Sequence, residues 1–240
     1  MKILITGGAS GLGEAITRRL AQNAANEVWF TYRSSAMKAQ ELEREFPNAR
    51  GIGCDFTKGE DMATLLKRMD ETGFDALVNN AISTPITKKH FHRMGLEVFK
   101  DGFAQNILPT IEITQRAITK FREKKGGRIV TVLTATLAGR PPAGYAEYTA
   151  AKAYIHSLAK SWAAENAVYG ITSNCISPGF MATKLTSDTD ERIVEHLTSQ
   201  HPLKRLLTTG EVAEAVEFFL KAPLHINGTN LLINAASEIL

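Results

Sequence analysis

Short apolar runs alternate with longer amphipathic stretches along most of the chain. The run at 74–78 is continuously apolar, as expected for a strand covered on both faces of a parallel sheet. The expected strands are residues 2–6, 27–32, 50–54, 74–78, 127–134, 171–176 and 229–233. The expected helices follow the first glycines to about residue 24 and cover about 36–46, 58–70, 100–124, 146–168 and 209–220. This order predicts one α/β domain over residues 1–240, with a doubly wound parallel sheet.

Residues 181–207 interrupt this alternation, because they are polar and carry only a weak helical pattern. A segment of this length beside the carboxyl ends of the strands is typical of a substrate lid. Ligands of doubly wound sheets bind at those carboxyl ends. The candidate residues below follow individual strands, so the topology predicts that they share one rim.

A glycine-rich turn stands between the first strand and the first helix. Glycines let the backbone approach a pyrophosphate, and the helix that follows offers free N–H groups to it. The spacing is Gly-x-x-x-Gly-x-Gly, and an ordinary flexible loop is the alternative interpretation. The candidate binding residues in the turn are Gly7, Ala9, Ser10, Gly11, Leu12 and Gly13.

The end of the second strand, Tyr32-Arg33-Ser34, bears on which dinucleotide binds. An acidic residue there would bind both ribose hydroxyls and repel a 2′-phosphate, but none is present. Arg33 can pair with a phosphate through its planar guanidinium, which favours NADP over NAD. The alternative is that Arg33 is a solvated arginine at the start of a helix.

Two further strands end in candidate polar residues. Asp55-Phe56 follows the third strand, where the carboxylate can accept a hydrogen bond from an adenine amino group. Its alternative role is to cap the helix that follows. Asn80-Ala81-Ile82 follows the fourth strand at the same rim.

Tyr148 and Lys152 are spaced to lie one turn apart on one helix face. A nearby ammonium favours the phenolate and lowers the tyrosine pKa from about 10 toward neutrality. Such a pair suits general acid–base chemistry. The motif alone is weak evidence, because chance often produces it. Asn106 lies among apolar residues inside an expected helix, so it is either structural or part of a site.

The net charge of +3 is small and both signs are interspersed, so no nucleic-acid or membrane partner is expected. Cys54 and Cys175 lack metal-ligand spacing, and buried reduced thiols are expected. His90 and His92 have no third ligand at useful spacing, so no metal site is predicted. The N-terminal run is too short for a signal segment, and we expect a cytoplasmic protein.

Taken together, these motifs make the sequence resemble the short-chain dehydrogenase/reductase family over nearly its whole length. The residues that carry the resemblance are Thr6–Gly13, Asn79–Ile82, Asn106, Tyr148–Lys152 and Pro178–Gly179. The resemblance implies a Rossmann-type fold and a hydride transfer between a nicotinamide cofactor and a ketone or secondary alcohol.

The resemblance also implies roles for individual residues. Tyr148 would exchange a proton with the carbonyl or alcohol oxygen, and Lys152 would hold the nicotinamide ribose and lower the pKa of Tyr148. Asn106 would position a water that relays protons to Lys152. The groups expected to fix the carboxamide of the cofactor, at the Pro178–Gly179 end of the sixth strand, belong to Phe180, Met181 and Thr183.

Two positions depart from the family pattern. The family places a serine about thirteen residues before the tyrosine, where this chain has Ala135. Thr134 carries the same hydroxyl at the strand end and is the first candidate for the role, with Thr136 as the second. The last glycine of Asn-Asn-Ala-Gly is replaced by Ile82, which would crowd the cofactor or reshape the pocket wall.

These departures leave a non-catalytic dinucleotide-binding sensor or scaffold as an alternative function. A narrower enzymatic alternative is the reduction of 3-oxoacyl groups on an acidic carrier protein, for which Lys125 and Arg128 are candidate contacts. Against it, Tyr169 stands where a basic residue is common in such members. The resemblance also implies a homo-oligomer, a tetramer or dimer. The sequence does not identify the substrate or the direction of the reaction.

Overall fold

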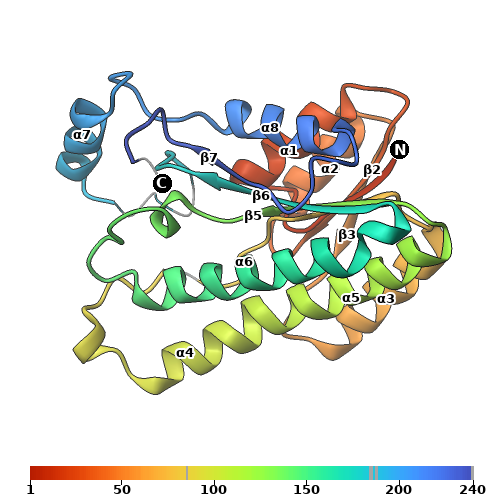
Figure 1. The fold of residues 1–240 in the computed structure, drawn as a ribbon, viewed down its shortest axis with the longest axis horizontal. Helices are drawn as coiled ribbons and strands as arrows, with labels where there is room; N and C mark the ends of the chain where they lie inside the picture. The colour runs from red at the N-terminus through yellow and green to blue at the C-terminus, as the bar shows by residue number, and fades with distance from the viewer. Residues whose placement is uncertain (85, 184–185, 187–188, 239–240) are drawn as a thin grey trace.

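A seven-stranded parallel sheet forms the centre of the protein, with helices packed on both of its faces (Figure 1). The computed structural model describes residues 1–84, 86–183, 186 and 189–238. The strands are β1 Lys2–Ile5, β2 Glu27–Tyr32, β3 Ala49–Gly53, β4 Ala76–Asn79, β5 Gly127–Val132, β6 Ile171–Pro178 and β7 Asn230–Ile233. Their order is β3-β2-β1-β4-β5-β6-β7, and every neighbouring pair is parallel. The predicted doubly wound parallel sheet is confirmed.

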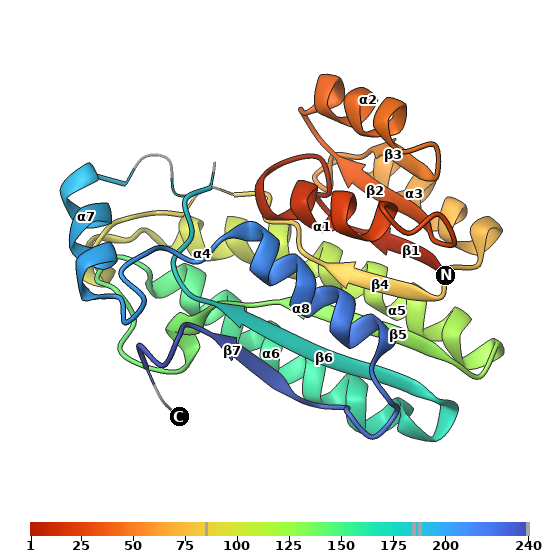
Figure 2. The same cartoon turned by 90° about the horizontal axis from the view of Figure 1, so that it is seen from above.

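Two layers of helices cover this sheet. One layer holds α1, α2 and α8, and the other holds α3, α5 and α6 (Figures 1 and 2). The helices are α1 Gly11–Ala21, α2 Ala36–Glu45, α3 Gly59–Thr72, α4 Leu96–Gly102, α5 Leu108–Glu123, α6 Ala146–Asn166, α7 Glu191–Gln200 and α8 Thr209–Lys221. The view from above shows α1 and α8 lying side by side across one face of the sheet.

The hydrophobic core lies in two parts, one on each face of the sheet. Ile3 and Ile5 of β1 pack in the cluster formed with α1 and α8, whereas Leu4 packs in the cluster formed with α3 and α5. Successive side chains of a strand point to opposite faces, so a strand covered on both sides must be apolar at every position. This is why β1 is a continuous apolar run.

The long helix expected over about 100–124 is broken in the structure. It consists of α4, a π-helical turn at Phe103–Ile107, and α5. Pro109 lies in the first turn of α5 and has no N–H to donate to the carbonyl four residues earlier. The regular helical ladder is therefore interrupted before Pro109, and Asn106 lies in the interruption.

The segment 181–207 contains one helix more than the sequence predicts. Helix α7 forms at Glu191–Gln200, capped by the carboxylate of Asp190, which accepts a hydrogen bond from the N–H of Arg192 at 2.8 Å. Thr183 and Thr186 are described in this segment, whereas 184–185 and 187–188 lie outside the described residues. Over the described residues, the structure contains no helix that combines the length and the apolar character needed to cross a membrane.

Candidate active site

The glycine turn lies at the carboxyl end of β1, where the strand order reverses between β1 and β4. Gly7 and Gly11 have φ angles of +68° and +54°, a region that residues with side chains rarely adopt. A Cβ on Gly13 would collide with the carbonyl oxygen of Gly7. The turn leads directly into α1, whose first N–H groups have no partner within the helix. This geometry fits the pyrophosphate of a dinucleotide.

The other candidate residues of the turn differ in exposure. Ala9 is buried and Leu12 packs against the core beneath the turn. Ser10 precedes α1 and is exposed, and its side chain makes no capping hydrogen bond. The hydroxyl of Ser10 is therefore not used to cap α1 and is accessible at the start of the helix.

Asn80 ties the glycine turn to the end of β4. Its side-chain amide donates to the carbonyl oxygens of Thr6 and Gly7 at 3.0 and 3.1 Å. The N–H groups of Asn80 and Ala81 both donate to the hydroxyl of Thr6 at 3.0 Å. Asn80 thus holds the turn in shape, and Ala81 lies within about van der Waals reach of Gly7.

The ends of β2 and β3 lie next to each other, as neighbouring parallel strands require. Arg33 is exposed and donates to the carbonyl oxygen of Ser83 at 3.1 Å. Its neighbours Tyr32 and Ser34 are half-buried and exposed, respectively. The side chain of Arg33 therefore connects the end of β2 to the segment that follows β4.

Asp55 makes the contacts of a local turn after β3. Its Oδ1 accepts hydrogen bonds from the N–H and the hydroxyl of Thr57 at 3.0 and 2.8 Å. These two bonds lower the pKa of Asp55 below its usual range. Phe56 packs against the core beside α3. The alternative that Asp55 caps the next helix is not found, because the N-cap of α3 is Lys58 and no side chain makes a capping hydrogen bond there.

Tyr148 lies in the first turn of α6, and Thr134 precedes the short 3₁₀ turn Ala135–Leu137 after β5. Burial raises the pKa of Tyr148, and a hydrogen bond from Thr134 partly opposes this. Thr136 instead donates to Thr134 at 3.3 Å and contacts Thr149 at 3.4 Å. Of the two candidate threonines, Thr134 therefore contacts Tyr148, whereas the described contacts of Thr136 are with Thr134 and Thr149.

Lys152 is held beneath the tyrosine by the backbone of β5. Its Nζ donates to the carbonyl oxygen of Val132 at 2.7 Å. Burial lowers the pKa of Lys152 to about 8. The predicted lowering of the Tyr148 pKa by Lys152 is not found, because the ammonium faces the Val132 carbonyl and burial dominates at the phenol.

Asn106 lies in the π-helical turn and fixes the segment that follows β4. Its Oδ1 accepts from the N–H of Ser83 at 2.7 Å, and its Nδ2 donates to the hydroxyl of Thr84 at 2.6 Å. Its main-chain carbonyl accepts from the hydroxyl of Thr110 at 2.7 Å. Asn106 is therefore both structural and part of the site.

A cavity of about 40 Å³ lies at the centre of this arrangement. Its wall includes Ile82, Asn106, Tyr148 and Lys152, so the side chain of Ile82 does shape the pocket. Glu147 also lines the cavity and is buried. The sequence gives no signal for this burial, because a glutamate in the first turn of a helix is usually an exposed residue favoured by the helix dipole.

The segment 181–207, which the sequence predicts to be a lid, begins near the glycine turn. The N–H of Gly179 donates to the carbonyl oxygen of Ile233 at 2.8 Å, which fixes the end of β6 after Pro178. A Cβ on Gly11 would lie 3.8 Å from the Cβ of Thr183. Its N–H donates to the hydroxyl of Thr186 at 2.9 Å. Two of the three expected carboxamide-binding residues, Phe180 and Met181, lie between these points and are half-buried.

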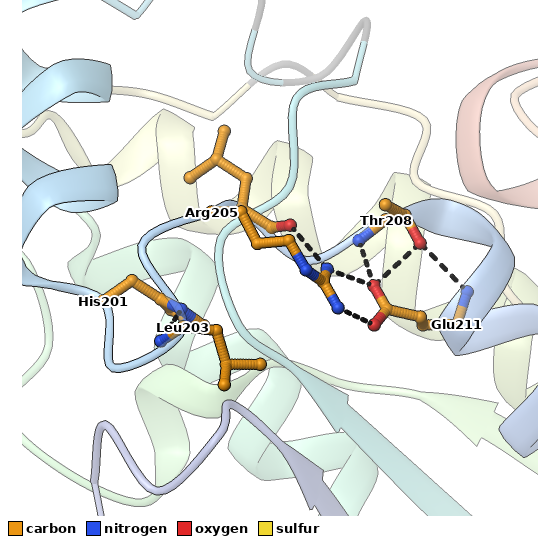
Figure 3. Close-up of polar contacts among 6 residues, drawn as sticks. His201, Leu203, Arg205, Thr208 and Glu211 are labelled. Atoms are coloured by element: carbon orange, nitrogen blue, oxygen red, sulfur yellow. Dashed lines mark hydrogen bonds and ion pairs between the residues drawn. The ribbon is translucent and has the colours of Figure 1, made fainter.

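The other end of the lid is anchored to α8 (Figure 3). The guanidinium of Arg205 donates to both carboxylate oxygens of Glu211 at 2.9 and 2.6 Å. Glu211 also accepts from the N–H of Thr208, while the Thr208 hydroxyl accepts from the N–H of Glu211, which completes a capping box. Arg205 holds the pKa of Glu211 well below its usual range. The end of the segment 181–207 is thus fixed to α8.

In the parts of the chain that the structure describes, no group of three or more His, Cys, Asp or Glu side chains could hold a metal ion. His90 and His92 are exposed. Cys54 and Cys175 are both free and buried, and burial raises the pKa of each thiol to about 12. The expectation of buried reduced thiols is confirmed.

Comparison with known proteins agrees with this geometry. A family model described as Enoyl-(Acyl carrier protein) reductase matches residues 7–235. The chain is 33% identical to the 3-oxoacyl-acyl-carrier-protein reductase MabA of Mycobacterium avium, over 90% of this chain and 81% of that protein. It is 28% identical to an L-fucose dehydrogenase of Bos taurus, over 99% of this chain and 89% of that protein.

A solved structure assigned as a gluconate dehydrogenase from Agrobacterium tumefaciens superposes with a TM-score of 0.88 at 26% identity. The match covers 100% of this chain and 96% of that one. Fold, glycine turn and sequence similarity therefore agree: the chain belongs to the short-chain dehydrogenase/reductase family of nicotinamide-dependent oxidoreductases that act on ketones and secondary alcohols.

Proposed function

We propose that this protein uses NADP(H) to interconvert a ketone and a secondary alcohol, with Tyr148 as the general acid and base. The observation that carries the proposal is the position of Thr134, Tyr148 and Lys152 at the rim that also carries the glycine turn. A bound nicotinamide would supply or accept the hydride. The residues of this chain would orient the substrate and move the proton.

Each group has a chemical task that follows from its surroundings. The Thr134 hydroxyl, which lies in hydrogen-bond range of Tyr148 in the ligand-free protein, would turn its single O–H to the substrate oxygen and align it. Tyr148 would give its phenolic proton to that oxygen during reduction and regain it between turnovers. Lys152 would bind the ribose of the cofactor, and Asn106 would keep the segment after β4 in place.

The mutation Tyr148→Phe tests the proposed acid, because it removes only the phenolic hydroxyl. Loss of a general acid costs about 10²- to 10⁴-fold in rate, so turnover with a carbonyl substrate should fall by at least about 10²-fold. Binding of NADPH, followed by its fluorescence, should change little. Full turnover in Tyr148→Phe would refute the assigned role, and binding without turnover of any carbonyl or alcohol in wild type would favour the sensor alternative.

Arg33 supports NADP as the cofactor rather than NAD. The side chain is exposed at the end of β2, and the neighbouring acid at the rim, Asp55, is engaged with Thr57. Arg33→Ala should weaken NADPH binding and leave NADH binding nearly unchanged, since only NADPH carries the 2′-phosphate. Equal losses for the two cofactors, measured by fluorescence titration, would contradict this assignment.

Reduction of a carrier-linked 3-oxoacyl group is a narrower candidate, which the similarity to the reductases of M. avium and Vibrio cholerae favours. Lys125 and Arg128, however, lie at the start of β5, whereas Thr134 follows its carboxyl end. A carrier bound at these residues would sit at the opposite end of β5 from the proposed site. Lys125→Glu should leave turnover of a free ketone unchanged, and a selective loss with a carrier-linked substrate would support this narrower function.

We also propose a homo-oligomer built on the face of α4, α5 and α6. Phe103, Leu108 and Tyr154 are 40%, 50% and 44% exposed, and the rings of Phe103 and Tyr154 pack edge to face at 5.4 Å. Contiguous exposed apolar side chains of this kind mark association surfaces. Light scattering should give a dimer or tetramer for wild type and a smaller species for Leu108→Glu.

The buried free thiols fit a reducing compartment, and we place the protein in the cytoplasm.

A further inference from the structure

The cavity beside Tyr148 contains polar groups that the protein itself does not satisfy. Asn79 and Thr131 line it, and their Oδ1 and Oγ1 atoms are buried with no hydrogen-bond partner among the described residues. Buried polar atoms are nearly always hydrogen-bonded. A cavity of about 40 Å³ with several polar partners in its wall is large enough for ordered water. The cavity is therefore a place where water can connect side chains.

Glu147 adds a carboxyl group to the same cavity. It is 8% exposed, and its side chain lies so close to Gly102 that a Cβ there would collide with Oε1. Burial is the cause that raises the pKa of Glu147, and within the described chain no cation pairs with it. An unpaired buried carboxylate is unfavourable, so burial shifts the balance at this position toward the protonated acid relative to an exposed glutamate.

The other residues that line the cavity determine with which groups Glu147 can exchange a proton. Tyr148 and Lys152, both on α6, are the titratable side chains that line the cavity with it. The lining from β4, β5, α5 and the segment 81–86 is neutral in the described chain, and Gly102 of α4 brings no charge. An ammonium has three donors and Lys152 uses one of them on Val132, so Lys152 can still donate into the cavity.

We propose that Glu147 is the internal proton donor and acceptor of this cavity, which exchanges a proton with Lys152 through cavity water. The proposal rests on the proposed function, in which Tyr148 gives its proton to the substrate oxygen. During reduction the Tyr148 phenolate regains a proton from the Lys152 ammonium, which becomes a neutral amine. The carboxylic acid of Glu147 then returns a proton to that amine through cavity water and becomes a carboxylate. The carboxylate then takes up one proton from solvent, and in the oxidative direction each transfer is reversed.

This role explains a position that packing alone does not. Asn106, which the family resemblance assigns to positioning a relay water, already uses its carbonyl oxygen to accept a hydrogen bond from Thr110 and its side chain to bond Ser83 and Thr84. Glu147, Tyr148 and Lys152 of α6 all line this one cavity, although a spacing of one residue does not by itself place Glu147 on the same helix face as Tyr148. Carboxyls with raised pKa values in such settings are characteristic of proton-transfer sites.

The matched variants are Glu147→Gln, which keeps the shape and removes the exchangeable carboxyl proton, and Glu147→Asp, which keeps the acid. Glu165→Gln is the control, because Glu165 is an exposed glutamate on the same helix. For Glu147→Gln we expect kcat to fall about tenfold, less than for loss of the direct acid. We also expect a changed dependence of kcat on pH and a larger solvent deuterium isotope effect. KM for NADPH should stay within about twofold, and Glu147→Asp should recover part of kcat.

A second measurement uses the protein without cofactor or turnover. The infrared band of a protonated carboxyl should persist at pH 6 in wild type, above the ordinary carboxyl pKa of about 4.3, and should be absent from Glu147→Gln. Absence of this band from wild type would overturn the proposal whatever the activity. If Glu147→Gln keeps the wild-type kcat and pH profile while Tyr148→Phe is inactive, the proposed role of Glu147 is refuted and the proposed function still stands. Full activity of Tyr148→Phe would instead overturn the proposed function.

Discussion

Replacing Lys152 by methionine should stabilise the ligand-free protein at neutral pH while it removes most turnover. The ammonium is buried and donates to the Val132 carbonyl at 2.7 Å, and burial lowers its pKa from 10.5 to about 8. A shift of one pKa unit corresponds to about 1.36 kcal/mol, so the buried charge costs the folded state about 3 kcal/mol relative to a neutral side chain. Methionine fills similar space without this charge.

The sign of the pH dependence follows from the lowered pKa. Below about pH 8 the lysine is charged in both folded and unfolded states, and the full cost is present. As the pH rises from about 8 toward 10.5, the folded state releases its proton first and wild type gains stability. About 2 kcal/mol of this gain should appear between pH 7 and 9.5, and Lys152→Met cannot show it.

Urea unfolding of wild type and Lys152→Met at several pH values between 7 and 9.5 measures this difference. The lost hydrogen bond to Val132 costs about 1 kcal/mol at every pH, so the informative quantity is the change with pH rather than the value at pH 7. Lys160→Met, at an exposed position on the same helix, should give a constant difference. A difference between wild type and Lys152→Met that does not change with pH would refute the argument that this ammonium is desolvated.

Three other substitutions test the glycine turn, the cavity and the lid. Gly13→Ala should destabilise the protein by about 2 kcal/mol in urea unfolding and weaken NADPH binding, because the new Cβ collides with the backbone of Gly7. The control Gly59→Ala, whose Cβ meets no atom within 4 Å, should change neither the stability nor NADPH binding. Gly102→Ala should displace the Glu147 carboxyl and lower kcat, but cause no further loss in a Glu147→Gln background; additive losses would contradict that contact. Arg205→Ala should lower the Tm at pH 7, and the difference should shrink as the pH falls below about 4.3, because Arg205 holds its carboxylate partner on α8 ionised. A Tm difference that does not shrink at all between pH 5 and pH 2 would exclude the ion pair as its cause.

The order of strands and helices could be predicted from the sequence because it depends on local patterns. Apolar runs such as 74–78 and the glycine turn at Gly7–Gly13 carry their own conformational requirement, whatever surrounds them. The rule that ligands bind at the carboxyl ends of parallel strands then places Arg33, Thr134 and Tyr148 at one rim. The fold class, the family and the identity of these rim residues therefore followed from the sequence.

The electrostatic character of the site was decided by tertiary structure. The burial of Glu147 depends on Gly102, which lies 45 residues earlier in the sequence and has no side chain to keep the carboxyl away. The pKa of Tyr148 is set by desolvation rather than by Lys152, because the ammonium is turned toward the backbone of β5. Burial and the direction of a hydrogen bond arise from contacts between distant segments, and a local pattern of residue types contains neither of them.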